Sequence, residues 1–253
     1  MVVLELQKGI IYGPVASRRL GRSLGINLSP TSVKYCSFDC IYCHYGRTPA
    51  ATASREYDKF LPTPTEVTAA LEDALARLGA PDYITFSGNG EPTYHPAFAE
   101  VAAGVREVRD RRAPASKLAI LSNAGGVGDP RVREGLGLFD VRIMKLDAGT
   151  PALFKLINCP APGVRFEDII TGLADLEPFT MQTCFVAGEP TNTTGNLVAD
   201  YLAVVTRIAP ARAQVYTIDR PVGTRGISKV SRERLEEIAR RLREEAGVET
   251  DVF

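Results

Sequence analysis

Short runs of β-branched and apolar residues alternate with helix-like segments along the chain, and this alternation constrains its fold more than any other feature. Six runs have the length and composition of buried strands: 24–29, 82–88, 117–124, 141–148, 180–187 and 213–219. Six other segments carry apolar residues at helical spacing: 64–79, 96–112, 131–139, 166–177, 193–208 and 231–247. Thr63 before Pro64 is a typical helix start, and Gly79 and Gly247 are typical helix ends.

This order of strands and helices predicts a parallel sheet, which right-handed crossovers curl in one direction. Six units are fewer than the eight of a complete barrel, so we favour a partial (β/α)6 TIM-like barrel over a doubly wound open sheet. We predict a single α/β domain over 1–253, with six β/α units from about 24 to 247. Both architectures bind ligands at the carboxyl ends of their strands.

Glycine-rich and polar stretches end or follow the predicted strands. They read GNGEPTYHP, NAGGVG, KLDAG, VAGEPTN and DRPVGTRG, and the first strand leads into the cysteine-rich segment 34–46. Turn residues are common in any loop, so each stretch alone is equally well explained as a turn. Five such stretches beside a cysteine cluster favour a functional site at this end of the sheet.

The composition argues against several classes of protein. Lysine plus arginine and aspartate plus glutamate both number 30, so nothing draws the whole chain to nucleic acid or to an anionic membrane. No stretch has the ~18 uncharged apolar residues of a membrane span, and MVVLELQKGIIYGP lacks the features of a signal peptide. We therefore expect a cytoplasmic protein with reduced thiols, in which three clustered cysteines out of five indicate a metal site.

Cys36, Cys40 and Cys43 form a C-x3-C-x2-C pattern that has several interpretations. A structural zinc site would need His44 as its fourth ligand, but adjacent residues rarely bind one tetrahedral ion. Residues 40–44 also match the C-x-x-C-H pattern of covalent haem attachment, a chemistry found outside the cytosol. Three buried thiols without any metal are unusual in so short a loop.

An iron–sulfur cluster is the remaining interpretation. A [4Fe–4S] cluster normally takes four thiolates, so three cysteines in the loop leave one iron open to another ligand. Cys159 and Cys184 are the only other cysteines, and Cys159 is the alternative fourth ligand. Both are equally compatible with a role as small apolar residues.

The spacing, with the aromatic Tyr42 just before the last cysteine, resembles the C-x3-C-x-aromatic-C pattern of the radical S-adenosylmethionine (SAM) superfamily. The resemblance covers nearly the whole chain and implies a partial (β/α)6 barrel, with a [4Fe–4S] cluster on Cys36, Cys40 and Cys43. It implies that SAM occupies the open iron and that an external flavodoxin- or ferredoxin-like protein supplies the electron. Cleavage of SAM would then give methionine and a 5′-deoxyadenosyl radical, which abstracts hydrogen from the substrate.

The resemblance also implies a set of SAM contacts. Gly90, Glu91 and Pro92 look like the "GGE" element of the superfamily, with Asn89 in place of its first glycine. The other positions lie at later strand ends or beside the last cysteine: Tyr42, Ser122, Asn123, Lys145, Asp147, Gln182, Thr183, Tyr216, Thr217 and Ile218. For Thr183 and Ile218, packing inside the barrel is an equally good explanation.

The segments GPVASRRLGRSLGINLSP, SGNGEPTYHP, KLDAG and VYTIDRP are similar to the wyosine-tRNA synthase (4-demethylwyosine synthase)-like subgroup. Those enzymes hold a second cluster on cysteines upstream of the main motif, whereas no cysteine precedes Cys36 here. Candidate substrate contacts are Arg18, Arg19, Arg22, His95 and Arg220. A solvated basic turn explains the first three equally well.

The substrate is left open by the sequence. A tRNA base and a small metabolite are the candidates, and the neutral net charge argues weakly against tRNA. One alternative is an activating enzyme that generates a radical on a partner protein. Another is a non-catalytic iron–sulfur or zinc protein that uses the cysteine loop for folding or electron transfer.

Overall fold

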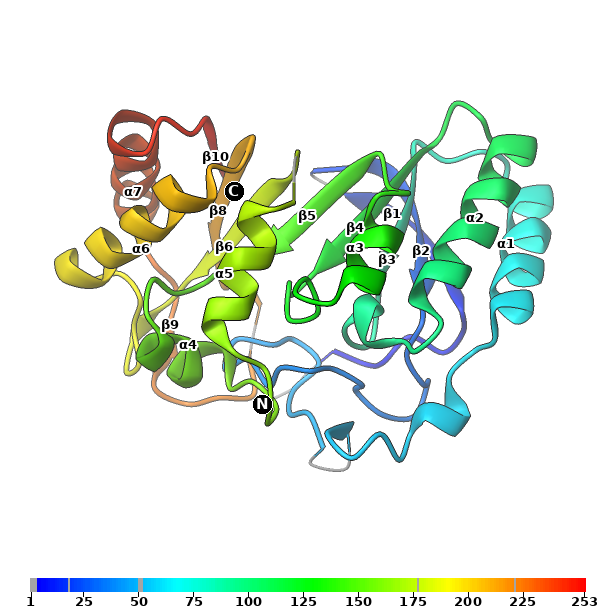
Figure 1. The fold of residues 1–253 in the computed structure, drawn as a ribbon, viewed down its shortest axis with the longest axis horizontal. Coiled ribbons are helices and arrows are strands. Elements are labelled where there is room, and N and C mark those ends of the chain that lie inside the picture. Colours follow the sequence, from blue (N-terminus) through cyan, green and yellow to red (C-terminus); the bar gives the residue numbers. More distant parts are fainter. Residues whose placement is uncertain (1–3, 18, 50–51, 177, 221) are drawn as a thin grey trace.

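Eight strands form one sheet in the order β1-β2-β3-β4-β5-β6-β8-β10 (Figure 1). Figure 1 shows the computed structural model, which describes residues 4–17, 19–49, 52–176, 178–220 and 222–253. The strands are β1 Ile11–Ser17, β2 Gly21–Asn27, β3 Tyr83–Ser87, β4 Lys117–Ser122, β5 Val141–Lys145, β6 Thr180–Phe185, β8 Arg212–Thr217 and β10 Thr250–Val252. From β2 to β10 every neighbouring pair is parallel, and only β1 runs antiparallel to its partner β2. Two short strands, β7 Ala187–Gly188 and β9 Ile227–Ser228, pair separately.

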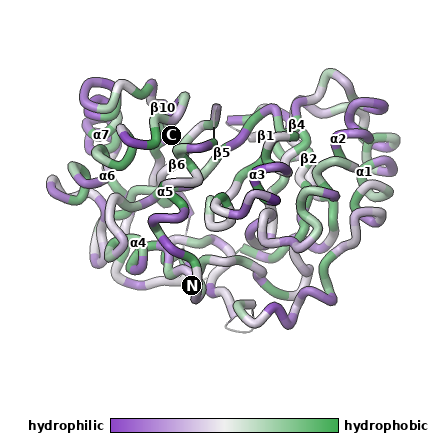
Figure 2. The backbone as a smooth tube through the Cα atoms, viewed as in Figure 1, coloured by the Kyte–Doolittle hydropathy of each residue, from purple (hydrophilic) through white to green (hydrophobic). Residues whose placement is uncertain are grey.

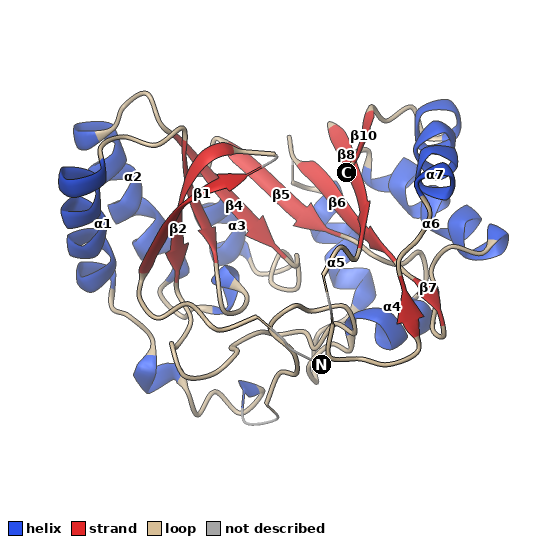
Figure 3. Ribbon diagram, turned by 180° about the vertical axis from the view of Figure 1, so that it is seen from behind, coloured by secondary structure: helices blue, strands red, loops and turns tan. Residues whose placement is uncertain are grey.

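Helices connect the parallel strands and cover one face of the sheet (Figure 1). They are α1 Pro64–Leu78, α2 Phe98–Arg112, α3 Pro130–Leu136, α4 Pro151–Asn158, α5 Phe166–Ala174, α6 Gly195–Ile208 and α7 Arg232–Glu245, with short 3-10 helices η2 Asp58–Phe60 and η3 Pro92–Tyr94. Seen from behind, the strands stand in front of these helices (Figure 3). This curved, helix-backed parallel sheet confirms the predicted partial α/β barrel. Among the described residues, no helix is both long and apolar enough to cross a membrane.

The six predicted strands and six predicted helices are all present, with ends displaced by up to a few residues. In the main sheet and among the α-helices, β1, α4 and β10 were not predicted, and neither were the short elements β7, β9, η2 and η3. Strand β1 is mostly exposed and contains Gly13 and Pro14, so it lacks the apolar pattern of a buried strand. Helix α4 is eight residues long and β10 three, too short for a periodic pattern to be recognised.

The core lies between the sheet and its helices. In α1 the buried residues Val67, Leu71, Ala74 and Leu75 recur at helical spacing and face the strands. Figure 2 shows the same division, with hydrophobic and hydrophilic stretches alternating along the outer helices. Thr63 caps α1 as expected, because its side chain accepts a hydrogen bond from the Glu66 amide in a capping box.

Gly149, just after β5, makes the closest approach between a strand-end loop and a helix. A Cβ added there would lie 2.2 Å from the backbone nitrogen of Tyr201 in α6. Backbone atoms cannot move aside as a flexible side chain can, so we expect Gly149→Ala to lower the free energy of unfolding by about 1–3 kcal/mol. Chemical denaturation of purified protein would measure this loss.

Gly195→Ala is the matched control, because Gly195 opens the same helix α6 and a Cβ there meets nothing within 4 Å. We expect this variant to be as stable as the parent or slightly more stable, since alanine favours helix over glycine. Equal stability of the two variants would contradict the packing constraint at Gly149.

Candidate functional site

A cavity of about 360 Å³ opens at the carboxyl ends of the parallel strands. All three clustered cysteines line it, together with residues that follow β3 and residues at the ends of β4, β5, β6 and β8. The cysteines belong to the long connection between β2 and α1, which runs along the lower edge of the view in Figure 1. The fold therefore brings the cysteine loop and the strand ends to one place, as the sequence predicted.

Side chains from other parts of the chain hold this loop. Cys36 Sγ lies 3.4 Å from the amide nitrogen of Phe38 and 3.5 Å from Asn123 Nδ2 at the end of β4. Cys40 Sγ lies 3.4 Å from Nδ2 of Asn158, the last residue of α4. The amide of Cys43 donates to the carbonyl of Cys40 at 3.0 Å. Cys36 and Cys40 thus contact side chains from two different parts of the structure, and Cys43 is bonded within the loop.

Gly90 and Glu91 join the cysteine loop to the strand ends. The amide of Glu91 donates to the carbonyl of Tyr35 at 3.0 Å, and a Cβ on Gly90 would lie 1.6 Å from that carbonyl oxygen. Only glycine allows this approach. The buried Glu91 carboxylate accepts hydrogen bonds from Thr93 (amide and Oγ1), from Ser122 Oγ and from the Asn123 amide, at 2.6–3.0 Å. Burial raises the pKa of Glu91, while these donors act in the opposite direction.

Asn89, which replaces the first glycine of the superfamily element, binds the N-terminal segment. Its Oδ1 accepts from the amide of Gln7 at 2.6 Å, and its Nδ2 donates to the Gln7 carbonyl at 2.9 Å. Nearby, the amide of Leu4 donates to the carbonyl of His44 at 2.8 Å, and Leu4 lines the cavity. The substitution therefore has a structural reason: it fastens the N-terminal segment beside the cavity.

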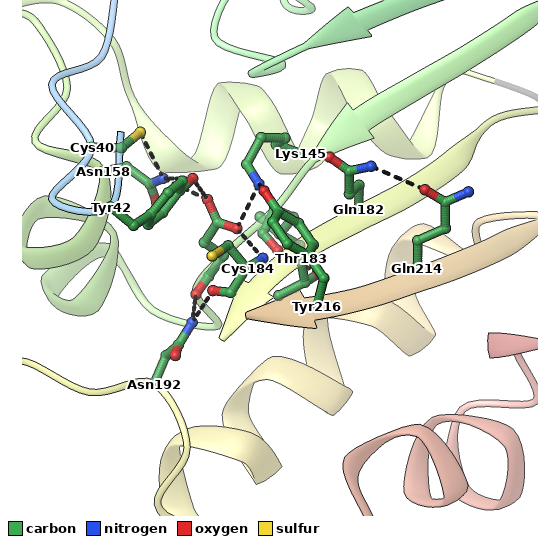
Figure 4. A network of polar contacts seen from close by, with 12 residues as sticks. Cys40, Tyr42, Lys145, Asn158, Gln182, Thr183, Cys184, Asn192, Gln214 and Tyr216 are labelled. Carbon is green, nitrogen blue, oxygen red and sulfur yellow. Dashed lines mark hydrogen bonds and ion pairs between the residues drawn. The ribbon is translucent and has the colours of Figure 1, made fainter. Parts of the chain in front are cut away.

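A second buried carboxylate, that of Asp147, organises the opposite side of the cavity. Figure 4 shows residues of the network around it, among them Tyr42, Lys145 and Asn158. It accepts hydrogen bonds from the Tyr42 hydroxyl, from Asn158 Nδ2 at 2.7 Å and from the amide of Cys184 at 2.8 Å. It also forms an ion pair with Lys145 at 3.2 Å. Asp147 thus connects the cysteine loop, the end of α4 and the strands β5 and β6.

Lys145 lies between this carboxylate and the cavity. Its Nζ donates to the Tyr216 hydroxyl at 2.9 Å and lies 5.0 Å and 4.8 Å from the ring centres of Tyr42 and Tyr216. Burial alone would lower the pKa of Lys145, but Asp147, Tyr216 and Cys184 together outweigh burial, so the pKa is raised. The cavity therefore contains a fixed ammonium group that can bind an anionic group of a ligand.

The donor set can be compared with the cofactors considered for it. All five cysteines are free thiols. Among the described residues, no three His, Cys, Asp or Glu side chains converge as ligands of one metal ion would. A tetrahedral zinc ion would bring its sulfurs to within about 4 Å of one another, given Zn–S bonds of ~2.3 Å. An iron–sulfur cluster takes one thiolate per iron, and three cysteines on the wall of one cavity are compatible with this requirement.

Most of the residues predicted to contact SAM line this cavity: Tyr42, Gly90, Glu91, Ser122, Asn123, Lys145, Gln182, Tyr216 and Ile218. Four do not. Thr183 Oγ1 donates to the Leu146 carbonyl and Thr217 Oγ1 accepts from the amide of Val230. Pro92 begins η3, and Asp147 lies behind Lys145 and Tyr42. Contact of these four with SAM stays a prediction.

Of the predicted substrate contacts that the structure describes, none lines the cavity. Arg18 lies outside the described residues. Arg19 stacks over the rings of Tyr216 and Phe253, at 4.8 and 4.5 Å from their centres. Arg22 opens β2, at the other end of the sheet, where its guanidinium donates to the carbonyls of Leu78 and Ala80.

The other two candidates do not line the cavity either, although Arg220 lies close enough to the cavity residue His44 to influence its charge. His95 uses both ring nitrogens, accepting from the Ala97 amide on Nδ1 and therefore donating from Nε2 to the Pro62 carbonyl. It lines a separate hollow between η3, α2 and α3. Arg220 is exposed in the loop after β8. A substrate role for any of these residues stays a prediction.

Sequence reasoning missed several cavity residues, above all Lys34, Leu4, Tyr45 and Cys184. Lys34 could have been predicted from the sequence, because a residue two positions before Cys36 must lie close to it. Leu4 and Tyr45 had none, because their proximity depends on the path of the N-terminal segment. Cys159, the alternative fourth ligand, does not line this cavity and instead lines a smaller hollow of about 250 Å³ on the other side of Cys36.

Replacing Asp147 tests whether this buried carboxylate carries the network. Asp147→Asn keeps the shape but leaves Lys145 buried without its counter-charge, and removing one partner of a buried pair typically costs about 3–5 kcal/mol. We expect a loss of that size in the free energy of unfolding measured with urea. Asp129→Asn, at the exposed N-cap of α3, should change it by less than ~0.5 kcal/mol. A small effect at Asp147 would show that the network is dispensable for stability.

Solved structures share this architecture at low sequence identity. A radical SAM methyltransferase from Sphaerobacter thermophilus superposes with a TM-score of 0.64 and 13% identity over 91% of this chain and 65% of that chain. A structure of TYW1 with a lysine-pyruvate adduct bound gives a TM-score of 0.60 and 14% identity over 88% of this chain and 73% of that chain. The fold of this chain is thus the one found in radical SAM enzymes.

Relatives by sequence identify its family. No protein-family model matches the chain. A GTPase Obg of Brachyspira hyodysenteriae is 28% identical over 98% of this chain, which spans 35% of that protein's length. A UPF0026 protein of Synechocystis sp. is 34% identical over 221 residues, covering 83% of this chain and 76% of that protein. The chain therefore belongs to the UPF0026 family.

Proposed function

We propose that this protein is a radical SAM enzyme. The observation that carries the proposal is that Cys36, Cys40 and Cys43 share one cavity with the polar ends of the parallel strands. The fold it shares with radical SAM enzymes supports the same conclusion. In this proposal the three thiolates bind a [4Fe–4S] cluster, and SAM lies across the strand ends with its amino and carboxylate groups at the open iron.

We propose that different residues of the cavity contact different parts of SAM. In this proposal the Gly90 backbone contacts the amino group of SAM, and the carboxylate of Glu91 holds that loop against β4. The ammonium of Lys145 offers a counter-charge to a carboxylate, and Tyr216 and Ile218 form an apolar wall for adenine. When bound, the cluster supplies one electron that breaks a carbon–sulfur bond of SAM, giving methionine and a 5′-deoxyadenosyl radical. That radical takes a hydrogen atom from the substrate and becomes 5′-deoxyadenosine.

The finer proposal places the chain near the wyosine-tRNA synthase-like subgroup. The four sequence segments named above support it, and the fold shared with TYW1 is compatible with it. Residues 1–35 contain no cysteine and so offer no thiolate for a second cluster. We therefore propose the shared core chemistry of that subgroup, with a tRNA base or a small metabolite as substrate and a flavodoxin- or ferredoxin-like electron donor. An alternative, activation of a partner protein, would show as a stable complex on co-purification.

Alanine variants of the cysteines test the cluster. Cys36→Ala, Cys40→Ala and Cys43→Ala should each abolish reductive SAM cleavage and lose iron, because three thiolates are the minimum that leaves a single open iron. Cys159→Ala is the matched control and should keep both. The measurements are iron content and 5′-deoxyadenosine formation after anaerobic reconstitution. Full activity in any of the first three variants, or loss of the cluster in the control, would overturn the assignment.

Electron paramagnetic resonance tests SAM binding directly. Reduced protein should show a [4Fe–4S]⁺ signal that changes when SAM is added, since SAM would ligate the open iron. A cluster signal that ignores SAM would indicate a fourth protein ligand, and stoichiometric zinc without iron would refute the proposal.

A further inference from the structure

Lys34 is a buried lysine within the cysteine loop whose charge the proposed reaction does not use. Its side chain is 4% exposed and lines the same cavity as Cys36, Cys40 and Cys43. Its Nζ donates to the carbonyl of Gly46 at 2.9 Å, on the far side of the loop from its own backbone. The lysine thus crosses the inside of the loop that carries all three thiols.

The surroundings of Lys34 keep it charged. Lysine is cationic at neutral pH, and here its Nζ has an acceptor in the Gly46 carbonyl and an ion-pair partner in Asp39. The nearest carboxylate, Asp39, is 3.7 Å away and is itself paired with Arg47 at 2.9 Å. Asp39 also accepts from the amide of Thr48 at 2.7 Å, so its charge is shared among three donors. Lys34 therefore keeps a positive charge that Asp39 neutralises only in part.

We propose that Lys34 sets the reduction potential of the cluster held by this loop. This inference rests on the proposed function. Reduction of a cluster adds one negative charge, and a cation in a low-dielectric site stabilises the more negative form. A buried ammonium beside the thiolates would raise the potential and so ease electron transfer from a biological donor. Lys34 acts here by its charge and position.

The loop provides a matched control for this charge. Arg47 forms an ion pair with the same Asp39 from the outside, and its side chain is 72% exposed. Water and salt screen an exposed charge far more than a buried one. Asp39→Asn provides the opposite change, because the amide oxygen can still accept from Thr48 while the negative charge near the cluster disappears.

The experiment is a redox titration of the reconstituted protein without SAM, followed by electron paramagnetic resonance. At one fixed potential, we expect Lys34→Met to lower the ratio of reduced to oxidised cluster at least about tenfold, a shift of ~59 mV for one electron. Lys34→Arg should recover most of this change, Asp39→Asn should shift the potential upward, and Arg47→Met should leave it unchanged.

Each outcome decides the inference. A Lys34→Met potential equal to that of the parent, at equal iron content, would overturn it while leaving the proposed function intact. If Lys34→Met assembles no cluster, Asp39→Asn decides: an upward shift supports the inference and an unchanged potential refutes it. Failure of the parent protein itself to bind a cluster would instead refute the proposed function.

Discussion

Two buried carboxylates, Glu91 and Asp147, hold the candidate site together. The connection between β2 and α1 contains little regular structure, so its polar groups need partners from elsewhere in the chain. Glu91 accepts hydrogen bonds from Ser122 and Asn123 at the end of β4, next to Gly90, which contacts the cysteine loop. Asp147 does the same on the opposite side through Tyr42 and Asn158. Each carboxylate is costly to bury, and each is compensated by several donors at once.

The fold was predictable because its signals are local. Buried strands and amphipathic helices of ordinary length leave a periodic pattern, and Thr63 and Gly79 mark the ends of α1 in the sequence. The elements that were not predicted lack such a pattern, because β1 is mostly exposed and α4 and β10 are short. Tertiary contacts, and not local preference, decide whether such segments become regular.

The part of the site that lies at the carboxyl ends of the strands could be predicted, because these ends meet at one edge of a parallel sheet. Cys36, Asn123 and Lys145 could be placed there because each follows or ends a recognisable strand. Asp147 and Asn158 could not be recognised as partners, since their contact arises from the course of the unpredicted helix α4. Arg22 and His95 show the converse case, since they were chosen as substrate contacts and neither lines the cavity. Arg22 was chosen for its charge and His95 because the chain has few histidines. In the structure each side chain donates a hydrogen bond to a backbone carbonyl.

The contrast between Asn89 and Gly90 bears on how such proteins can diverge. Position 90 is closed to any side chain by the carbonyl of Tyr35, whatever chemistry the cavity performs. Position 89 is different, because a glycine there would keep the backbone bonds to Tyr35 and Asn27 and lose the side-chain bonds to Gln7 and Pro30. Substitution of Asn89 would therefore remove side-chain bonds to the N-terminal segment and keep the backbone bond to Tyr35. Two neighbouring residues are thus constrained differently. Gly90 is constrained by its packing against the cysteine loop, and Asn89 by its bonds to the N-terminal segment beside the cavity.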